Sequence, residues 1–318
     1  MLNYCKIAQD FLKFEGNERL DLINRLSTNK VDKLGKFKGI KTILTTDKGR
    51  FADLLTLYNF GDFVFTACSE SNSDSVITHL DKYTIMDDFQ VTDLSGTHET
   101  ILFYGDDVER FVKDLFNIDI SGLVNNDFEI YIEDNRHAII AKNDDPFGGI
   151  YFIHGVQDAE FYHKKIFNAE VKEKFGLNEI TTHDYEVKRI DYGIPKFRRE
   201  MTDDTNPLEC GLEKYVSFTK GCYIGQEVIA RLDTYDKISK HLVGLKLSAP
   251  LPDEFKAGEI KINSDNKECG FVTSFVVSEQ NENTGLGFVK TAMLDFNKEY
   301  EIKLGEKKIN CHLIKINN

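Results

Sequence analysis

Two kinds of apolar spacing alternate along the first 180 residues of the chain. Leu20, Ile23 and Leu26 recur at three-residue intervals and predict an amphipathic helix that Asn17 caps. Similar patterns predict helices over 73–83, 106–116 and 158–175. Runs typical of strands lie at 41–46, 50–57, 62–67, 128–132, 137–141 and 150–154. Helices and strands in this order indicate an α+β fold.

The spacing changes beyond residue 238, where helical periodicity nearly disappears. Short strand-like runs, separated by turn residues, lie at 241–247, 259–262, 270–277, 286–290, 300–304 and 308–316. Such runs predict a small antiparallel barrel or sandwich. Because 318 residues are too many for one ordinary core, we expect an α+β region over 1–237, with two subdomains, and a β-domain over 238–318.

Charge and cysteine content narrow the class of protein. The net charge of −13 argues against a general nucleic-acid binder. Residues 188–240 nevertheless carry ten Lys and Arg against nine Asp and Glu, a local balance that suits an anionic ligand. The six cysteines are widely separated, which favours a reducing cytoplasm and gives no iron–sulfur or zinc motif. No apolar stretch is long enough to span a membrane, and the start of the chain does not read as an export signal.

The most informative segment is the octamer 220–227, Lys-Gly-Cys-Tyr-Ile-Gly-Gln-Glu. A helix is predicted to start after Gly225, with Glu227 in its first turn and Arg231 in its last, as the helix dipole favours. Cys222 therefore precedes a helix N-terminus and neighbours Lys220, a setting that stabilises thiolate. We take these two as candidate catalytic residues. The alternative is a packed cysteine in a strand-to-helix turn, beside a solvated lysine.

The octamer resembles the signature of the YgfZ family of folate-binding proteins, which is related to the glycine-cleavage T-protein, an aminomethyltransferase. Five further segments resemble the family in the expected order, at 24–29, 47–54, 189–195, 206–209 and 272–274. The resemblance implies T-protein-like folate-binding domains followed by a C-terminal antiparallel β-barrel that closes over the folate site. It also implies tetrahydrofolate as ligand, iron–sulfur client or assembly proteins as partners, and an indirect effect on tRNA modification.

The resemblance also places candidate folate-binding residues in two segments. Arg189 and Asp191 would share one face of an extended segment and address the pterin ring or the glutamate tail. The alternative for this pair is a surface ion pair of little energetic weight. The candidates in the octamer and its helix are Tyr223, Gln226, Glu227 and Arg231. Tyr223 can equally be a packing residue.

Two departures separate the chain from the aminomethyltransferases. Those enzymes place a carboxylate at the reactive folate nitrogen, and alignment on the Gly49 turn puts Ala52 there. The next residue, Asp53, would point to the opposite face of the strand. The enzymes also hold the pterin with a Gly-Glu-x-Gly segment, whereas residues 148–151 contain no glutamate.

Three functions are therefore compared. The first is a folate-binding protein that supports assembly or repair of iron–sulfur enzymes through Cys222. The second is a tetrahydrofolate-dependent aminomethyl or methyl transferase. In the third, folate is a structural or sensing ligand of a non-catalytic protein. The octamer favours the first over the second, and the sequence leaves open whether any reaction is catalysed.

Overall fold

The structure is a computed structural model that describes residues 1–235, 237–252 and 254–316. The chain forms two units, each assembled from separate segments. Unit 1 contains Met1–Leu44, Ala52–Ile180 and Thr219–Ile224, and unit 2 contains Thr45–Phe51, Thr181–Phe218 and Gly225–Asn318. The octamer is thus divided after Ile224, so its lysine and cysteine belong to unit 1 and its helix belongs to unit 2.

The first sheet of unit 1 has five strands in the order β3-β4-β5-β2-β6. Their bounds are β2 (Gln9–Glu15), β3 (Lys38–Thr45), β4 (Phe51–Asn59), β5 (Val64–Ser69) and β6 (Gln90–Asp93). Helices α1 (Arg19–Leu26) and α2 (Ser73–Tyr83) pack on it through apolar side chains that include Leu22, Leu26 and Leu80. The predicted cap of α1 is wrong, because the N-cap residue is Glu18 and Asn17 instead donates to Asp88.

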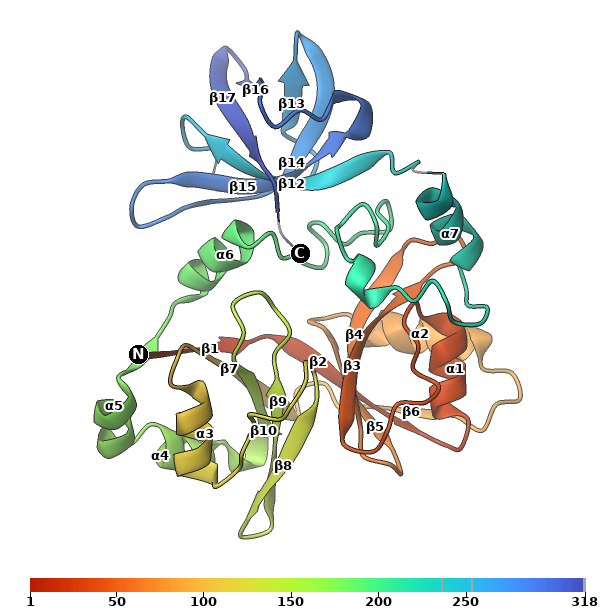
Figure 1. The fold of residues 1–318 in the computed structure, drawn as a ribbon, viewed down its shortest axis with the longest axis vertical. Coiled ribbons are helices and arrows are strands. Elements are labelled where there is room, and N and C mark those ends of the chain that lie inside the picture. The colour runs from red at the N-terminus through yellow and green to blue at the C-terminus, as the bar shows by residue number, and fades with distance from the viewer. Residues whose placement is uncertain (236, 253, 317–318) are drawn as a thin grey trace. The chain divides into compact units, whose positions relative to one another are not determined.

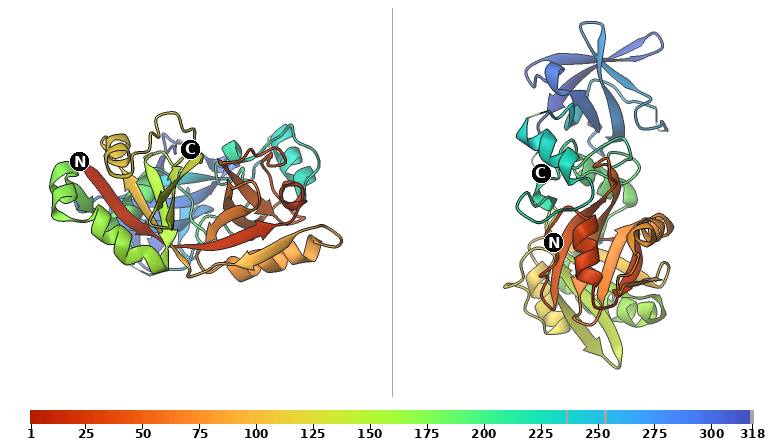
Figure 2. Two further views of the ribbon diagram at one scale, coloured as in Figure 1. Left: turned by 90° about the horizontal axis from the view of Figure 1, so that it is seen from below. Right: turned by 90° about the vertical axis from the view of Figure 1, so that its right-hand side faces the viewer.

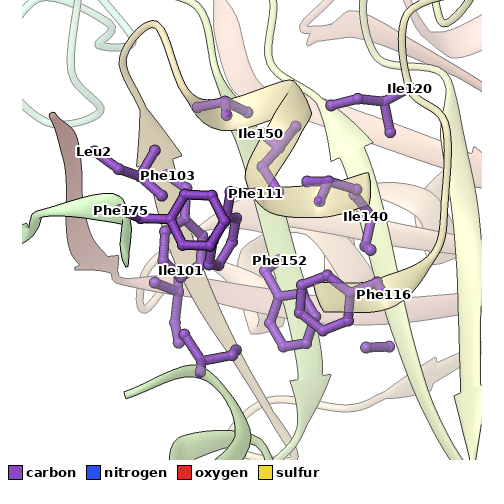
Figure 3. Packing of buried hydrophobic residues seen from close by; sticks show 14 of the residues in the cluster. Leu2, Ile101, Phe103, Phe111, Phe116, Ile120, Ile140, Ile150, Phe152 and Phe175 are labelled. Carbon is purple, nitrogen blue, oxygen red and sulfur yellow. The ribbon is translucent and has the colours of Figure 1, made fainter. Parts of the chain in front are cut away.

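The second sheet of unit 1 has six strands in the order β11-β1-β7-β10-β9-β8. Their bounds are β1 (Leu2–Ile7), β7 (His98–Tyr104), β8 (Phe128–Glu133), β9 (Arg136–Lys142), β10 (Ile150–Gly155) and β11 (Leu177–Glu179). Helix α3 (Val108–Phe116) packs on it through aromatic side chains (Figure 3). The Phe103 and Phe111 rings lie 4.9 Å apart, and the Phe116 and Phe152 rings 5.1 Å apart.

The predicted long helix over 158–175 is two helices, α4 (Ala159–Ile166) and α5 (Ala169–Phe175). The break falls at Asn168, whose extended backbone and side-chain oxygen cap α5 by accepting from Val171 N at 3.0 Å. Both helices bury residues in the same cluster, so the apolar spacing continues across the break. Periodicity alone therefore could not reveal it, although an asparagine is a favoured N-cap residue.

The C-terminal strands of unit 2 form a closed antiparallel barrel, as predicted (Figures 1 and 2). The order is β12-β15-β14-β13-β16-β17, with bounds β12 (Lys240–Leu247), β13 (Lys261–Ser264), β14 (Lys267–Val277), β15 (Asn283–Lys290), β16 (Glu299–Leu304) and β17 (Lys307–Ile314). Alternation of apolar and polar residues explains the closure. On β17, for example, Ile309, Cys311 and Leu313 are buried inside, while their neighbours face outward. No helix of the described residues is both long and apolar enough to cross a membrane.

Unit 2 also contains helices α6 (Thr182–Asp191) and α7 (Gln226–Thr234). Helix α6 contacts β14 and β15 of the barrel. Helix α7 begins directly after Gly225, as predicted, and its start packs against the turn between β3 and β4. Gly49 and Gly225 have φ angles of 65° and 80°, and a Cβ atom on Gly225 would lie 2.5 Å from the Thr46 carbonyl oxygen. The turn can approach α7 only because both positions lack side chains.

We predict that Gly225→Ala destabilises the protein. The left-handed backbone alone costs alanine about 1–2 kcal/mol, and the contact with the Thr46 carbonyl adds to this cost. The matched control is Gly221→Ala in the same octamer, where no atom lies within 4 Å of the added Cβ and φ is not positive. Urea unfolding should separate the two variants, and equal midpoints would contradict the close approach.

Candidate functional site

The Lys220 side chain anchors the first half of the octamer to unit 1. It is 7% exposed, and its ammonium group donates to three backbone carbonyls. These are Asn24 O at 2.7 Å, Ser27 O at 2.8 Å and Asn29 O. Because α1 ends at Leu26, the lysine satisfies carbonyls at the negative end of that helix. A lysine ammonium has three N–H donors, so all of them have backbone partners.

This geometry gives Lys220 a structural role. The three carbonyls occupy all of its N–H donors, so the ammonium does not also donate to the Cys222 thiol, and stabilisation of a thiolate by its charge stays a prediction. Burial lowers the pKa of Lys220 to about 8, against the opposing charge of Asp32. Its Nζ lies 5.2 Å from the centre of the Tyr223 ring. Tyr223 is itself buried, which raises the pKa of its hydroxyl to about 12. Lys220 and Tyr223 together hold the segment before α7 in place.

Cys222 lies between these two anchors and is exposed. The structure describes all six cysteines, and the other five are buried. Burial raises the pKa of each buried thiol, to about 12 for Cys5 and Cys311. Backbone N–H of Ile224 donates to the Arg25 carbonyl at 2.9 Å, so the loop is tied to α1 on the other side of the cysteine as well. The loop therefore presents one accessible thiol on an ordered backbone.

The polar residues predicted from the octamer helix lie on α7. Gln226 is its first residue, Glu227 lies in its first turn, and Arg231 lies in its last turn. Gln226 is partly exposed, and the other two are exposed. Their side chains are accessible to an anionic ligand with hydrogen-bonding edges, which is the chemistry that a folate offers.

Arg189 belongs to a buried network and not to an extended ligand-binding segment. A capping box between Thr181 and Asp184 starts α6, so 189–191 is helical and the strand expectation is wrong. Residues two apart on a helix are about 200° apart around the axis, so Arg189 and exposed Asp191 do not share a face. Arg189 is 3% exposed.

All five N–H donors of Arg189 have partners within unit 2. They are Glu186, the Ile194 carbonyl, Glu200 and Ser274, at 2.8–3.3 Å. Ser274 also donates to Glu200 at 2.6 Å. Burial alone would raise the pKa of Glu186, but the charges of Arg189 and Lys196 lower it. The network joins segments 189–195 and 272–274, two of those that resemble the YgfZ family. Glu200 links them, and it was not among the predicted site residues.

Ala52 and Asp53 on β4 have different environments, as their neighbouring positions on a strand require. Ala52 is partly buried and packs against the apolar cluster beneath α1 and α2. The Asp53 carboxylate is fully buried and accepts from Ser69, Asn72 and Leu54 N at 2.6–3.1 Å. Burial raises the pKa of Asp53, and these hydrogen bonds oppose the rise. Asp53 thus ties β4 to β5 and to the start of α2.

The loop before β10 contains two aspartates that were not among the predicted site residues. Asp144 and Asp145 both pair with buried Lys41 of β3. Asp145 also accepts from the Tyr151 hydroxyl at 2.8 Å. These carboxylates have cationic and hydroxyl partners inside unit 1, so they stabilise the loop against the sheet.

Comparisons with known proteins agree with this architecture. Residues 240–316 match the family model "Glycine cleavage T-protein C-terminal barrel domain". The chain resembles the glycine cleavage system aminomethyltransferase T of Bartonella henselae, with a TM-score of 0.83 and 17% identity over 99% of this chain and 85% of that one. The chain has the fold of the T-protein aminomethyltransferases.

Sequence relatives extend the likeness over most of the chain. An aminomethyltransferase of Thermoanaerobacter pseudethanolicus is 20% identical over 95% of this chain and 82% of its own length. A chloroplastic candidate transferase of Arabidopsis thaliana is 28% identical over 88% of this chain, which spans 63% of that protein's length. The chain is homologous to the aminomethyltransferases over most of its length.

We predict that Lys220→Met destabilises the protein by about 1–3 kcal/mol at pH 7, because it leaves buried carbonyls without donors. Lys30→Met, at an exposed position in the loop after α1, is the control and should stay within about 0.5 kcal/mol of wild type. Urea unfolding measures both.

A comparison of wild type with Lys220→Met also tests the protonation state of Lys220. Its pKa is about 8 in the folded protein, against 10.5 for the unperturbed group. Between these values the unfolded chain binds more protons than the folded one, so stability rises with pH there. The stability of wild type relative to Lys220→Met should therefore increase from pH 8 to pH 10. A constant difference would show that the pKa is not lowered.

We predict that iodoacetamide modifies Cys222 before the other five cysteines at neutral pH. The reason is exposure, since the other thiols are buried and their pKa values are raised. Peptide mass spectrometry of the briefly treated native protein measures the order of modification. Earlier labelling of Cys68 or Cys311 would contradict the described burial.

Proposed function

We propose that the protein binds a reduced folate and supports the assembly or repair of iron–sulfur enzymes, with indirect effects on tRNA modification. The observation that carries this proposal is the exposed Cys222 on a loop that Lys220 and Ile224 hold in place. A thiol presented in this way can ligate iron transiently, or it can attack a client disulfide, which forms a mixed disulfide and releases the other client sulfur as a thiolate. Homology to the aminomethyltransferases supports the folate part of the proposal.

The residues of this chain fit folate unequally. Arg231, Gln226 and Glu227 are accessible and can bind the glutamate tail and the hydrogen-bonding edge of a pterin. Arg189 does not fit, because each of its donors is already used within unit 2. Of the predicted folate-binding residues, those on α7 are therefore the ones that can contact the ligand.

Calorimetry with 5-formyltetrahydrofolate tests the folate part. Wild type and Cys222→Ala should bind alike, while Arg231→Ala should weaken binding about two- to fivefold through loss of an exposed ion pair. Arg110→Ala, a solvent-exposed arginine of α3 in unit 1, is the matched control. No binding by wild type, or equal losses in the two arginine variants, would contradict the proposal.

The cellular part depends on Cys222 alone. Cys222→Ser should lower iron–sulfur enzyme activities, most clearly under oxidative stress, while folding and folate binding stay unchanged. Cys68→Ser is the thiol control, because that cysteine is buried. Normal enzyme activities in Cys222→Ser cells would reduce the residue to a part of the loop structure.

The second candidate function is aminomethyl transfer, which the likeness to aminomethyltransferases over 95% of the chain favours. Against it, Ala52 supplies no carboxylate, and the neighbouring Asp53 carboxylate is committed to β5 and α2. Turnover of an aminomethylated lipoyl carrier with tetrahydrofolate would establish this second function. We expect none.

A further inference from the structure

Unit 2 contains a cavity that lies apart from all the residues assigned above. It has a volume of about 580 Å³ and is bounded by loop 198–205, segment 255–261 and the strands β12, β14 and β15. On the barrel side its wall includes Phe271 and Phe288, which neighbour the interior residues Val272 and Val289. The cavity therefore lies on the outside of the barrel and within the size range of small-molecule sites.

The charge of this cavity is opposite to that of the protein. Five of its lining residues are Lys or Arg and two are Asp, in a chain with 40 Lys and Arg against 53 Asp and Glu. Lys240 and Lys261 have carboxylate partners, at 3.2 and 3.6 Å. Within the described residues, exposed Arg199 and Lys256 form no ion pair. Their positive charge is available to an anion.

The two available cations come from segments that are in contact with each other. Arg199 donates to the backbone carbonyl of Phe255 at 3.1 Å, and Phe255 directly precedes Lys256. Both side chains line the cavity, so a phosphate group bound there can interact with both positive charges. The planar guanidinium also matches phosphate oxygens, which a point charge alone does not.

Aromatic rings line the cavity beside these cations. Phe255 and Phe271 are each partly exposed. The Phe271 ring packs 5.5 Å from Phe288, and Lys261 Nζ lies 5.7 Å from its centre. A planar heterocycle can stack on the exposed part of the Phe271 ring when the exposed Lys261 side chain moves aside.

The cavity also contains acceptors. Asp203 and Asp204 are exposed in loop 198–205, and Asp203 forms no ion pair among the described residues. A carboxylate beside cations does not suit a ligand that is anionic throughout. It does suit the hydroxyl groups of a sugar, which donate to carboxylates.

We propose that this cavity binds a nucleoside phosphate, with the base on Phe271, the sugar hydroxyls at Asp203 and the phosphates at Arg199 and Lys256. The three kinds of lining group match the three parts of such a ligand. This site goes beyond the proposed folate-related function and does not depend on it.

Calorimetry with ADP and with inorganic pyrophosphate, using the full chain at low salt, tests the assignment. Wild type should bind ADP more tightly than pyrophosphate. The double variant Arg199→Ala/Lys256→Ala should weaken ADP binding at least about tenfold, as loss of charge-assisted hydrogen bonds predicts. The matched control is Lys246→Ala/Lys308→Ala, which removes two exposed barrel lysines that do not line the cavity.

Phe271→Leu tests the stacking separately from the charge. It should weaken ADP about fivefold or more and leave pyrophosphate binding unchanged. Thermal unfolding of each variant provides the check that it is folded, and raising the salt concentration on wild type gives a second measure of the ionic contacts.

Four results with ADP and pyrophosphate alone would overturn the proposal. These are no ADP binding at millimolar concentration, an equal loss in the control double variant, an equal effect of Phe271→Leu on pyrophosphate, or an ADP affinity that salt does not reduce. Displacement of ADP by 5-formyltetrahydrofolate would also overturn it, because the cavity would then be a folate subsite. Failure of folate binding itself would leave the nucleotide result unaffected.

Discussion

The position of the octamer depends on one contact, in which the ammonium group of Lys220 donates to three carbonyls around the end of α1. A buried charge without a carboxylate partner is costly, and here the backbone dipoles of a helix end take the place of that partner. The contact joins positions almost 200 residues apart in sequence, so it closes a long loop of chain. Cys222 lies two residues further on, so this contact also fixes its backbone position. The cysteine is exposed because the backbone is held in this way.

Other buried charges of this protein also have structural partners. Arg189 uses all its donors inside unit 2, Lys41 holds Asp144 and Asp145 in unit 1, and the Asp53 carboxylate connects β4 to α2. Removing one partner of such a cluster is strongly destabilising because it leaves an uncompensated charge. Residues that suggested ligand contacts in the sequence therefore divide into two classes. The buried ones stabilise the fold, and the exposed ones, which are Cys222, Asp191 and the polar residues of α7, remain accessible.

The sequence predicted the element types well where apolar spacing was decisive. The barrel strands, α2 and α7 follow directly from alternation or helical periodicity, and the barrel is confirmed by the fold comparison. Prediction from the sequence failed where a local polar contact determines the start of a helix. Asn168 divides a predicted helix whose apolar spacing is continuous. The Thr181–Asp184 capping box starts a helix at a segment that we expected to be extended. At the site, the sequence indicated the octamer and the helix after it. The sequence could not show that Lys220 binds backbone carbonyls, because Asn24, Ser27 and Asn29 are distant from it in sequence.

The most direct test of this account is the rate of Cys222 alkylation as a function of reduced-folate concentration. Because Cys222 precedes the first residue of α7 by only four positions in the sequence, folate bound at α7 should slow the alkylation, with a half-saturation equal to the dissociation constant from calorimetry. In Lys220→Met, which frees the loop, bound folate should no longer protect the thiol. An alkylation rate that stays constant under saturating folate in wild type would contradict the account, because it would separate the cysteine from the ligand that it is proposed to serve.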